Sequence, residues 1–155
     1  PSAKLKVGSV LDASCESNES YDVSLLIGVH SIFDNFEDCF TNIINWTKPG
    51  GKVYIAGMFN PFPLDVFIKY KGSNAPENTA YESGWNIFSQ ESVSLYLQNN
   101  RKVKSFTFKK FDIEKDLQRQ DDPVRSWTLK DARNSRFIVN GLCLLQPHYL
   151  LDIYL

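Results

Sequence analysis

Tyr21-Asp-Val-Ser-Leu-Leu-Ile-Gly-Val29 and Lys48-Pro-Gly-Gly-Lys-Val-Tyr-Ile-Ala-Gly-Met-Phe59 are the two apolar runs that decide the fold. Runs of this kind are typical of strands buried in a parallel sheet, and the segment between them has helical spacing. The order predicts a βαβ crossover. Open parallel sheets bind ligands at the carboxyl ends of their strands, so function is expected at residues 28–32 and 57–60.

The helix between the two runs has a clear start and end. Asn35 is a suitable N-cap, and the apolar stripe that follows ends at Pro49-Gly50-Gly51. The members of this stripe are Phe36, Phe40, Ile43, Ile44 and Thr47. Other patterns predict strands at 5–10, 102–111 (with a bulge) and 149–155, a short helix at 64–71, a helix at 90–99 capped by Ser89, and a tight Asn-Gly hairpin turn within 136–144.

The composition excludes several classes of protein. The chain has 155 residues, 43% hydrophobic and 23% charged, which suits one globular domain. A net charge of −1 offers no footprint for nucleic acid or an anionic membrane, and no apolar run is long enough to span a bilayer. Three scattered cysteines show no metal spacing, and together with the lack of a signal peptide they favour a cytoplasmic setting.

Three motifs occur in a recognisable order: Val7-Gly8-Ser9, Tyr21-Asp22-Val23 and Thr47-Lys48-Pro49-Gly50-Gly51-Lys52-Val53. They resemble the second half of a class I S-adenosylmethionine-dependent methyltransferase. The resemblance implies a partial, three-layer Rossmann-like α/β fold, with a mostly parallel sheet closed by an antiparallel carboxyl-terminal hairpin. Residues 1–155 are then the carboxyl-terminal part of one domain whose first βαβ units are missing, and 60–88 an insertion on the substrate side.

The resemblance also implies where S-adenosylmethionine would lie. Ser9 and Val10 would line the adenine side, with Asp12 an alternative in the same role, while a solvated turn is the other interpretation. Ile27, Gly28 and Val29 would lie beside the methionine end and the transferred methyl group. The family's glycine-rich loop and its ribose-binding acidic residue are absent from the chain, so we expect weak cofactor binding and no activity by this fragment alone.

One histidine and several aromatic residues are candidates for the chemistry. His30 follows the first apolar run, where a neutral imidazole can act as a general base, although a lone histidine is more often structural. His148 is interpreted as a surface or turn residue. Aromatic and amide side chains can wall an acceptor pocket, or most of them can belong to the core. The acceptor candidates are Phe59, Asn60, Tyr81, Trp85 and Trp127.

Three functions remain open from the sequence. The first is methyl transfer to the oxygen or nitrogen of a small-molecule acceptor, because the motifs of base-methylating enzymes are absent and the net charge is close to zero. No metal site is expected. The second is a methyltransferase-like interaction subunit without catalysis. The third, disfavoured by the Lys-Pro-Gly-Gly motif, is a nucleotide-dependent oxidoreductase. A sheet without its first strands would expose an apolar edge, which predicts self-association.

Overall fold

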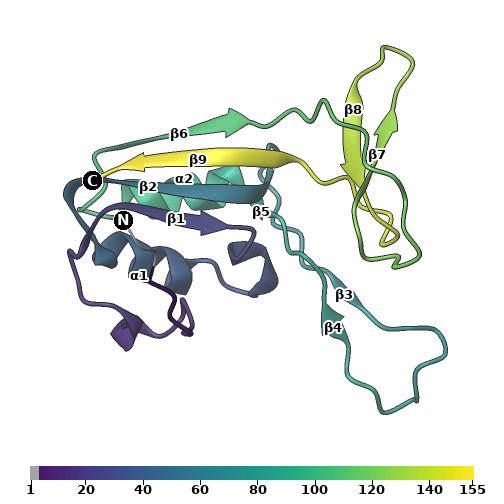
Figure 1. Ribbon diagram of the computed structural model, residues 1–155, viewed down its shortest axis with the longest axis horizontal. Coiled ribbons are helices and arrows are strands. Elements are labelled where there is room, and N and C mark those ends of the chain that lie inside the picture. The colour runs from purple at the N-terminus through teal and green to yellow at the C-terminus, as the bar shows by residue number, and fades with distance from the viewer. Residues whose placement is uncertain (1–3) are drawn as a thin grey trace.

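The computed structural model describes residues 4–155 and is built around one mixed sheet (Figure 1). The strand order is β1-β2-β9-β6, with the short β5 paired to the end of β2. The elements of the main sheet and its helices are β1 (Tyr21–Ile27), α1 (Glu37–Trp46), β2 (Thr47–Asn60), β5 (Phe88–Ser89), α2 (Gln90–Gln98), β6 (Ser105–Lys110) and β9 (His148–Tyr154). Two 3-10 turns, η1 (Ala13–Cys15) and η2 (His30–Ile32), flank β1.

The predicted βαβ crossover is confirmed. β1 and β2 are parallel, with Leu26 opposite Ile55 and Ile27 opposite Ala56, and the Gly28 N–H extends the pairing by donating to the Ala56 carbonyl at 2.8 Å. α1 joins the two strands. The carboxyl ends of both strands therefore lie at one edge of the sheet, which we call the carboxyl edge.

Both helices cover the same face of the sheet. The predicted apolar stripe of α1 is buried, and Phe36 of this stripe packs on Tyr96 of α2 with their ring centroids 5.6 Å apart. The Thr41 and Tyr96 hydroxyl groups are 2.8 Å apart, so they are hydrogen-bonded. Beneath the helices lie the fully buried strand residues Val53, Ile55, Leu151 and Ile153. This face holds the main hydrophobic core.

The opposite face of the sheet has no helix over it among residues 4–155. Its side chains form cross-strand rows that begin apolar at β1 and end polar at β6. One row runs Leu25, Tyr54, Asp152 and Thr107. On β1 the side chains of Val23, Leu25 and Ile27 are 53%, 61% and 67% exposed, which is unusual for three apolar residues on one strand. The described residues thus form two layers.

Two hairpins project beyond the carboxyl edge of the sheet (Figure 1). One contains β3 (Lys69–Tyr70) and β4 (Glu82–Ser83), and the other contains β7 (Trp127–Lys130) and β8 (Arg136–Val139). A small second core of Met58, Ile68 and Ile87 lies beneath them. The hairpins thus extend the molecule on the side where the parallel strands end.

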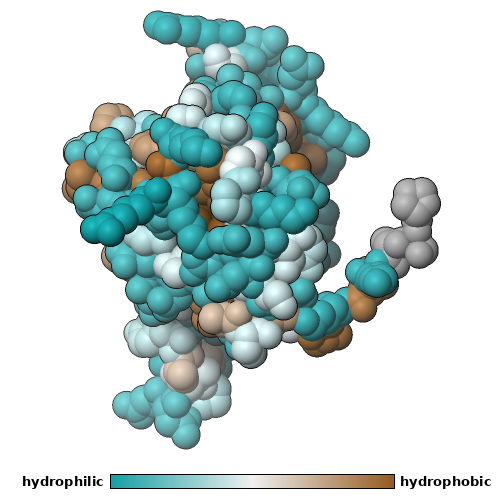
Figure 2. Space-filling view, turned by 90° about the vertical axis from the view of Figure 1, so that its left-hand side faces the viewer, coloured by the Kyte–Doolittle hydropathy of each residue, from teal (hydrophilic) through white to brown (hydrophobic). Residues whose placement is uncertain are grey.

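Four sequence predictions about local structure are wrong. Residues 5–10 form no strand: Leu5 and Val7 are 98% and 101% exposed, and Figure 2 shows the segment that follows the grey residues as an arm standing away from the body. No helix forms at 64–71, because Val66 exchanges backbone hydrogen bonds with Ile87. The tertiary pairing overrides the local preference.

The other two wrong predictions concern the bulge expected within 102–111 and the Asn-Gly turn expected within 136–144. β6 pairs with β9 in continuous register, without the expected bulge. The Asn-Gly pair makes no two-residue turn, because the Gly141 N–H donates to the Pro123 carbonyl and the strand pairing resumes only at Leu145. In both places a long-range contact sets the backbone, and the local sequence does not reveal it.

In residues 4–155 no helix combines the length and the apolar character that crossing a membrane requires. Over the same range, no cluster of three or more histidine, cysteine, aspartate or glutamate side chains is arranged to hold a metal ion.

Candidate functional site at the carboxyl edge of the sheet

A cavity of about 230 Å³ opens at the carboxyl edge, where residues from five separate segments meet. Its floor is made by the strand ends, and its walls come from the loop before β5 and from the segments on either side of the β7–β8 hairpin. The lining residues are Gly28, Ser31, Gly57, Met58, Trp85, Ser126, Gln146 and His148. We call this the edge cavity. None of these residues carries a formal charge at neutral pH when His148 is neutral.

The floor of the edge cavity depends on two glycines. Gly28 has φ of +67°, a left-handed conformation that other residues adopt at a cost, and a Cβ there would meet nothing within 4 Å. The backbone at the end of β1 is therefore open to close approach. Gly57 lies against the ring of His30, which leaves no room for a side chain. Both glycines keep side chains from filling the strand ends.

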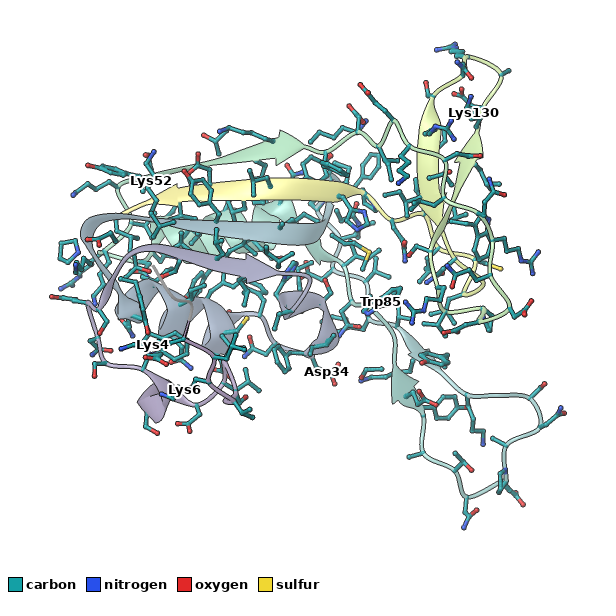
Figure 3. The ribbon with its side chains drawn as sticks, in the orientation of Figure 1. Lys4, Lys6, Asp34, Lys52, Trp85 and Lys130 are labelled. Atoms are coloured by element: carbon teal, nitrogen blue, oxygen red, sulfur yellow. The ribbon has the colours of Figure 1, made fainter. Side chains whose placement is uncertain are left out.

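Trp85 forms the apolar wall and is held by the residue that follows it. The Asn86 side chain is fully buried, accepts a hydrogen bond from the Ile68 N–H at 2.9 Å and donates to the Phe33 carbonyl at 2.8 Å. The Asn86 N–H donates to the Ser31 carbonyl at 2.7 Å. Figure 3 shows Trp85 between the end of the main sheet and the two projecting hairpins. Asn86 thus fixes the place of the indole.

The polar wall is formed by Ser126, Gln146 and His148. Gln146 is only 3% exposed, and its Oε1 accepts a hydrogen bond from the Ser126 hydroxyl at 2.7 Å. The His148 Nδ1 lies 2.9 Å from the Gln146 carbonyl oxygen. His148 also opens β9, directly opposite Met58 of β2. A cluster of hydrogen-bonding groups thus faces the apolar wall of Trp85 and Met58.

His30, the sequence candidate for a general base, lies in the core. Its ring is fully buried, stacks on Phe59 with centroids 4.6 Å apart, and lies with Nε2 3.2 Å from the Met58 carbonyl. Burial lowers the pKa of His30 to about 4, against the opposing effect of the Met58 hydrogen bond. Nδ1 is buried without a partner. Its role as a base stays a prediction, and an acceptor molecule could reach this ring only after a rearrangement.

The residues predicted to hold the cofactor divide between two places. Gly28 lines the edge cavity, with the 67% exposed Ile27 before it and the half-buried Val29 after it. Ser9 and Val10 line a second cavity of about 380 Å³ between the amino-terminal segment, the edge of β1 and α1. The structure does not bring all six residues into one cavity.

Internal hydrogen bonds occupy the polar groups on the adenine side. The Ser9 hydroxyl accepts from the Leu11 N–H at 3.2 Å, and the Val10 carbonyl accepts from the Asn42 side chain at 2.9 Å. Asp12 is exposed and caps η1, where the Ser14 hydroxyl and N–H lower the pKa of its carboxyl group. These residues form an ordered turn, and their assignment to the adenine remains a prediction.

The residues at the carboxyl edge fit S-adenosylmethionine only in part. The open backbone at Gly28 and the exposed strand end suit a ligand that passes over the carboxyl edge. An acidic side chain placed for ribose and a glycine-rich loop for the methionine end are not found in residues 4–155. The residues that would form one wall of such a site are Ile27, Gly28 and Val29, and their assignment to the cofactor stays a prediction.

Among the predicted acceptor residues, only Trp85 lines the edge cavity. Phe59 is fully buried beneath His30, and Asn60 closes its own turn by bonding the Phe62 N–H and the Leu64 carbonyl. Tyr81 is 66% exposed on the β3–β4 hairpin. Trp127 lies on β7, and the Cζ atom of Arg119 lies over its ring, 5.1 Å from the ring centroid. The role of these residues in binding stays untested, but the structure disperses them.

Sequence reasoning missed the polar wall of the edge cavity. Ser126, Gln146 and His148 lie far along the chain from the two apolar runs, and they meet them only because β9 pairs with β2. A usable signal was present: β9 was predicted as a strand, and an antiparallel partner of β2 must begin where β2 ends. This signal would have placed His148 at the carboxyl edge, whereas the local sequence alone indicates a surface or turn residue.

Comparison with solved structures identifies the fold. A SAM-dependent methyltransferase from Methanosarcina mazei superposes on 97% of this chain with a TM-score of 0.50 and 11% sequence identity. The YcgJ protein from Bacillus subtilis superposes on 95% of it with a TM-score of 0.51 and 9% identity. The chain has a partial class I methyltransferase fold. The predicted partial Rossmann-like α/β fold is thereby confirmed, with β1, β2, β9 and β6 forming its sheet, although residues 4–155 form two layers and not the expected three.

The chain spans only part of the structures it matches. It covers 66% of the Methanosarcina protein, 69% of YcgJ and 40% of TehB from Haemophilus influenzae, to which it is 10% identical with a TM-score of 0.47. A comparison with family models finds no match, and neither does a comparison with curated proteins. At identities of this size the similarity concerns the fold alone.

Proposed function

We propose that this chain forms the carboxyl-terminal part of an S-adenosylmethionine-dependent methyltransferase that acts on the oxygen or nitrogen of a small molecule. The observation that carries the proposal is the edge cavity, which lies at the carboxyl edge of a methyltransferase-fold sheet beside the open backbone of Gly28. Ligands of open α/β sheets bind at this edge. A cavity of about 230 Å³ is large enough for a small acceptor.

We propose different roles for the segment 27–29 and for the edge cavity. Bound S-adenosylmethionine supplies an activated methyl group, so the protein has mainly to align the acceptor and remove its proton. Ile27, Gly28 and Val29 lie where the methyl donor would pass. Met58 and Trp85 offer apolar contact to the acceptor, and the polar wall offers hydrogen bonds.

Calorimetric titration with S-adenosylhomocysteine tests the proposal. It is carried out on this chain and on the same chain preceded by the upstream sequence of its gene. Binding that appears, or strengthens at least tenfold, with the upstream sequence supports the proposal. A Gly28→Val variant of the longer chain should then lose the binding, because a branched side chain at φ of +67° is strained and would stand over the strand end. Absence of binding by both chains would refute a cofactor-dependent activity.

The uncovered sheet face favours a second candidate, a methyltransferase-like interaction subunit. The apolar side chains of Val23, Leu25 and Ile27 are exposed together on the edge strand β1, and such patches mark contact surfaces. The same titration separates the two candidates, since an interaction subunit would not bind S-adenosylhomocysteine with or without upstream sequence. Either candidate is compatible with self-association through β1.

A further inference from the structure

The hydrogen bond made by His148 fixes which of its ring nitrogens can accept a proton. A backbone carbonyl can only accept a hydrogen bond, so the Nδ1 that lies 2.9 Å from the Gln146 carbonyl must carry the hydrogen. In the neutral ring Nε2 is then bare, with its lone pair directed away from Gln146. His148 is half-buried and lines the edge cavity. Nε2 is therefore a preset proton acceptor on a residue that lines this cavity.

Gln146 adds an unused donor to the same cavity. Its Oε1 is occupied by the Ser126 hydroxyl, while its Nε2 has no hydrogen-bond partner within residues 4–155. The residue is 97% buried, given that its exposed fraction is 3%. Nε2 is not one of the buried side-chain atoms without a partner, which in residues 4–155 are His30 Nδ1 and Gln90 Nε2, so it keeps access to solvent and is free to donate to a ligand acceptor atom. The polar wall can thus offer one hydrogen bond and receive another.

The rest of the edge cavity limits what can bind. About 230 Å³ corresponds to about eight water molecules at roughly 30 Å³ each, which suits a single ring with small substituents. Trp85 and Met58 provide apolar contact for such a ring, and the lining contains no charged side chain to neutralise an ionic ligand. The cavity therefore selects a small, uncharged ring compound that carries an O–H or N–H group.

We propose that His148 is the general base of this site and that the acceptor is such a phenol-like or N-heterocyclic ring; the inference rests on the proposed function. The acceptor oxygen or nitrogen attacks the methyl carbon and forms the new O–CH₃ or N–CH₃ bond. The S–CH₃ bond breaks, and its electron pair stays on sulfur, which becomes a neutral thioether. The acceptor proton passes to Nε2 of His148, and the imidazolium keeps its Nδ1–H bond to the Gln146 carbonyl.

Nitrogen NMR of the two imidazole rings tests the first half of the inference on this chain. The chain contains only two histidines, so a His148→Gln variant assigns both sets of signals. We expect the neutral His148 ring in the Nδ1–H form. Phenol should shift its Nε2 resonance, anisole, which lacks the O–H, should leave that resonance in place, and benzoate should not bind. A ring in the Nε2–H form, or an equal response to phenol and benzoate, overturns the inference.

Kinetics of the full-length protein test the second half once an acceptor is found. His148→Gln should lower kcat by about 10²–10⁴-fold, the usual contribution of a general base, with KM for the acceptor within about threefold. Lys130→Gln on the exposed end of β7 is the control and should leave both constants unchanged. Unchanged kcat in His148→Gln refutes the base. Because S-adenosylhomocysteine binding is measured separately, failure of the cofactor hypothesis would be distinguished from failure of this assignment.

Discussion

The ring of His30 lies so close to the backbone of Gly57 that a side chain on residue 57 could not be accommodated. Gly57 occupies a buried position on β2, where a larger residue would ordinarily add to the core. The glycine instead admits an imidazole from η2, which also stacks on Phe59 and lies within hydrogen-bonding distance of the Met58 carbonyl. This contact ties the turn after β1 to the end of β2 and so shapes the edge cavity.

Gly57→Ala should therefore destabilise the protein. The added methyl group must displace the His30 ring or the strand, and overpacking of this kind costs about 1–3 kcal/mol in the free energy of unfolding. Urea denaturation followed by far-UV circular dichroism measures the difference. Gly72→Ala is the matched control, because a Cβ at Gly72 meets nothing within 4 Å, and it should change stability by less than about 0.5 kcal/mol. Equal stability of both variants would show that the contact is absent in solution.

The buried His30 should make stability depend on pH. Its pKa is lowered to about 4 in the folded protein, so between pH 4 and its ordinary value of 6.5 only the unfolded chain binds the proton. Stability then rises with pH in this window, by up to about 1.4 kcal/mol per pH unit, and the gain is complete above pH 6.5. Urea unfolding at a series of pH values measures the slope.

The comparison for this prediction is His30→Phe, which keeps an aromatic ring against Phe59 but does not titrate. The free energy of unfolding of this variant should depend less on pH between 4 and 6.5 than that of the native protein, after the contribution of the carboxylates, which both proteins share, is subtracted. Identical slopes for the native protein and His30→Phe would mean that His30 is protonated in the folded state.

The sheet was predictable where local pattern and tertiary structure agree. The strands of the two opening runs, the α1 stripe and the start of α2 at Ser89 all follow rules that act over a few residues, and each is confirmed. The expected burial of the first run is wrong, because no layer covers the outer face of β1 in residues 4–155 and Val23, Leu25 and Ile27 are exposed. Asn35 was expected to cap α1. The helix begins at Glu37 with Phe36 directly before it, and the Asn35 Oδ1 accepts a hydrogen bond from the Glu37 N–H at 2.7 Å. The strand predicted at residues 5–10 fails because no neighbouring strand pairs with it in the described chain.

The candidate site was predictable only in part. The carboxyl edge and Gly28 were foreseen, because strand direction fixes which ends meet, and Trp85 was one of the aromatic residues chosen as acceptor candidates. The acceptor residues were chosen by type, and type alone could not tell that Phe59 points into the core or that Tyr81 lies on a projecting hairpin. The polar wall depends on β9 pairing with β2, a contact between segments about ninety residues apart. Only the topology places His148 opposite Met58.

Ser89→Ala should weaken α2. The Ser89 hydroxyl accepts a hydrogen bond from the Ser92 N–H at 2.9 Å, and the loss of an N-cap of this kind costs about 1 kcal/mol. Thermal and urea unfolding measure the change. Ser94→Ala within the same helix removes a hydroxyl that bonds only the Gln90 carbonyl, and it should be neutral or slightly stabilising because alanine is the better helix former. Similar losses in both variants would argue against a capping role.

The exposed apolar side chains of β1 predict self-association. Val23, Leu25 and Ile27 form an edge strand with no charged side chain among residues 23–27, so two copies can pair without opposing charges. Sedimentation equilibrium should show a mean mass that rises with concentration, and Leu25→Lys should return it to the monomer value. Thr107→Lys is the matched control, because Thr107 lies in the same cross-strand row at its polar end and should leave association unchanged. If the native protein stays monomeric at all concentrations, β1 is not a contact surface between copies of this chain, and the interaction-subunit candidate loses the observation that favours it.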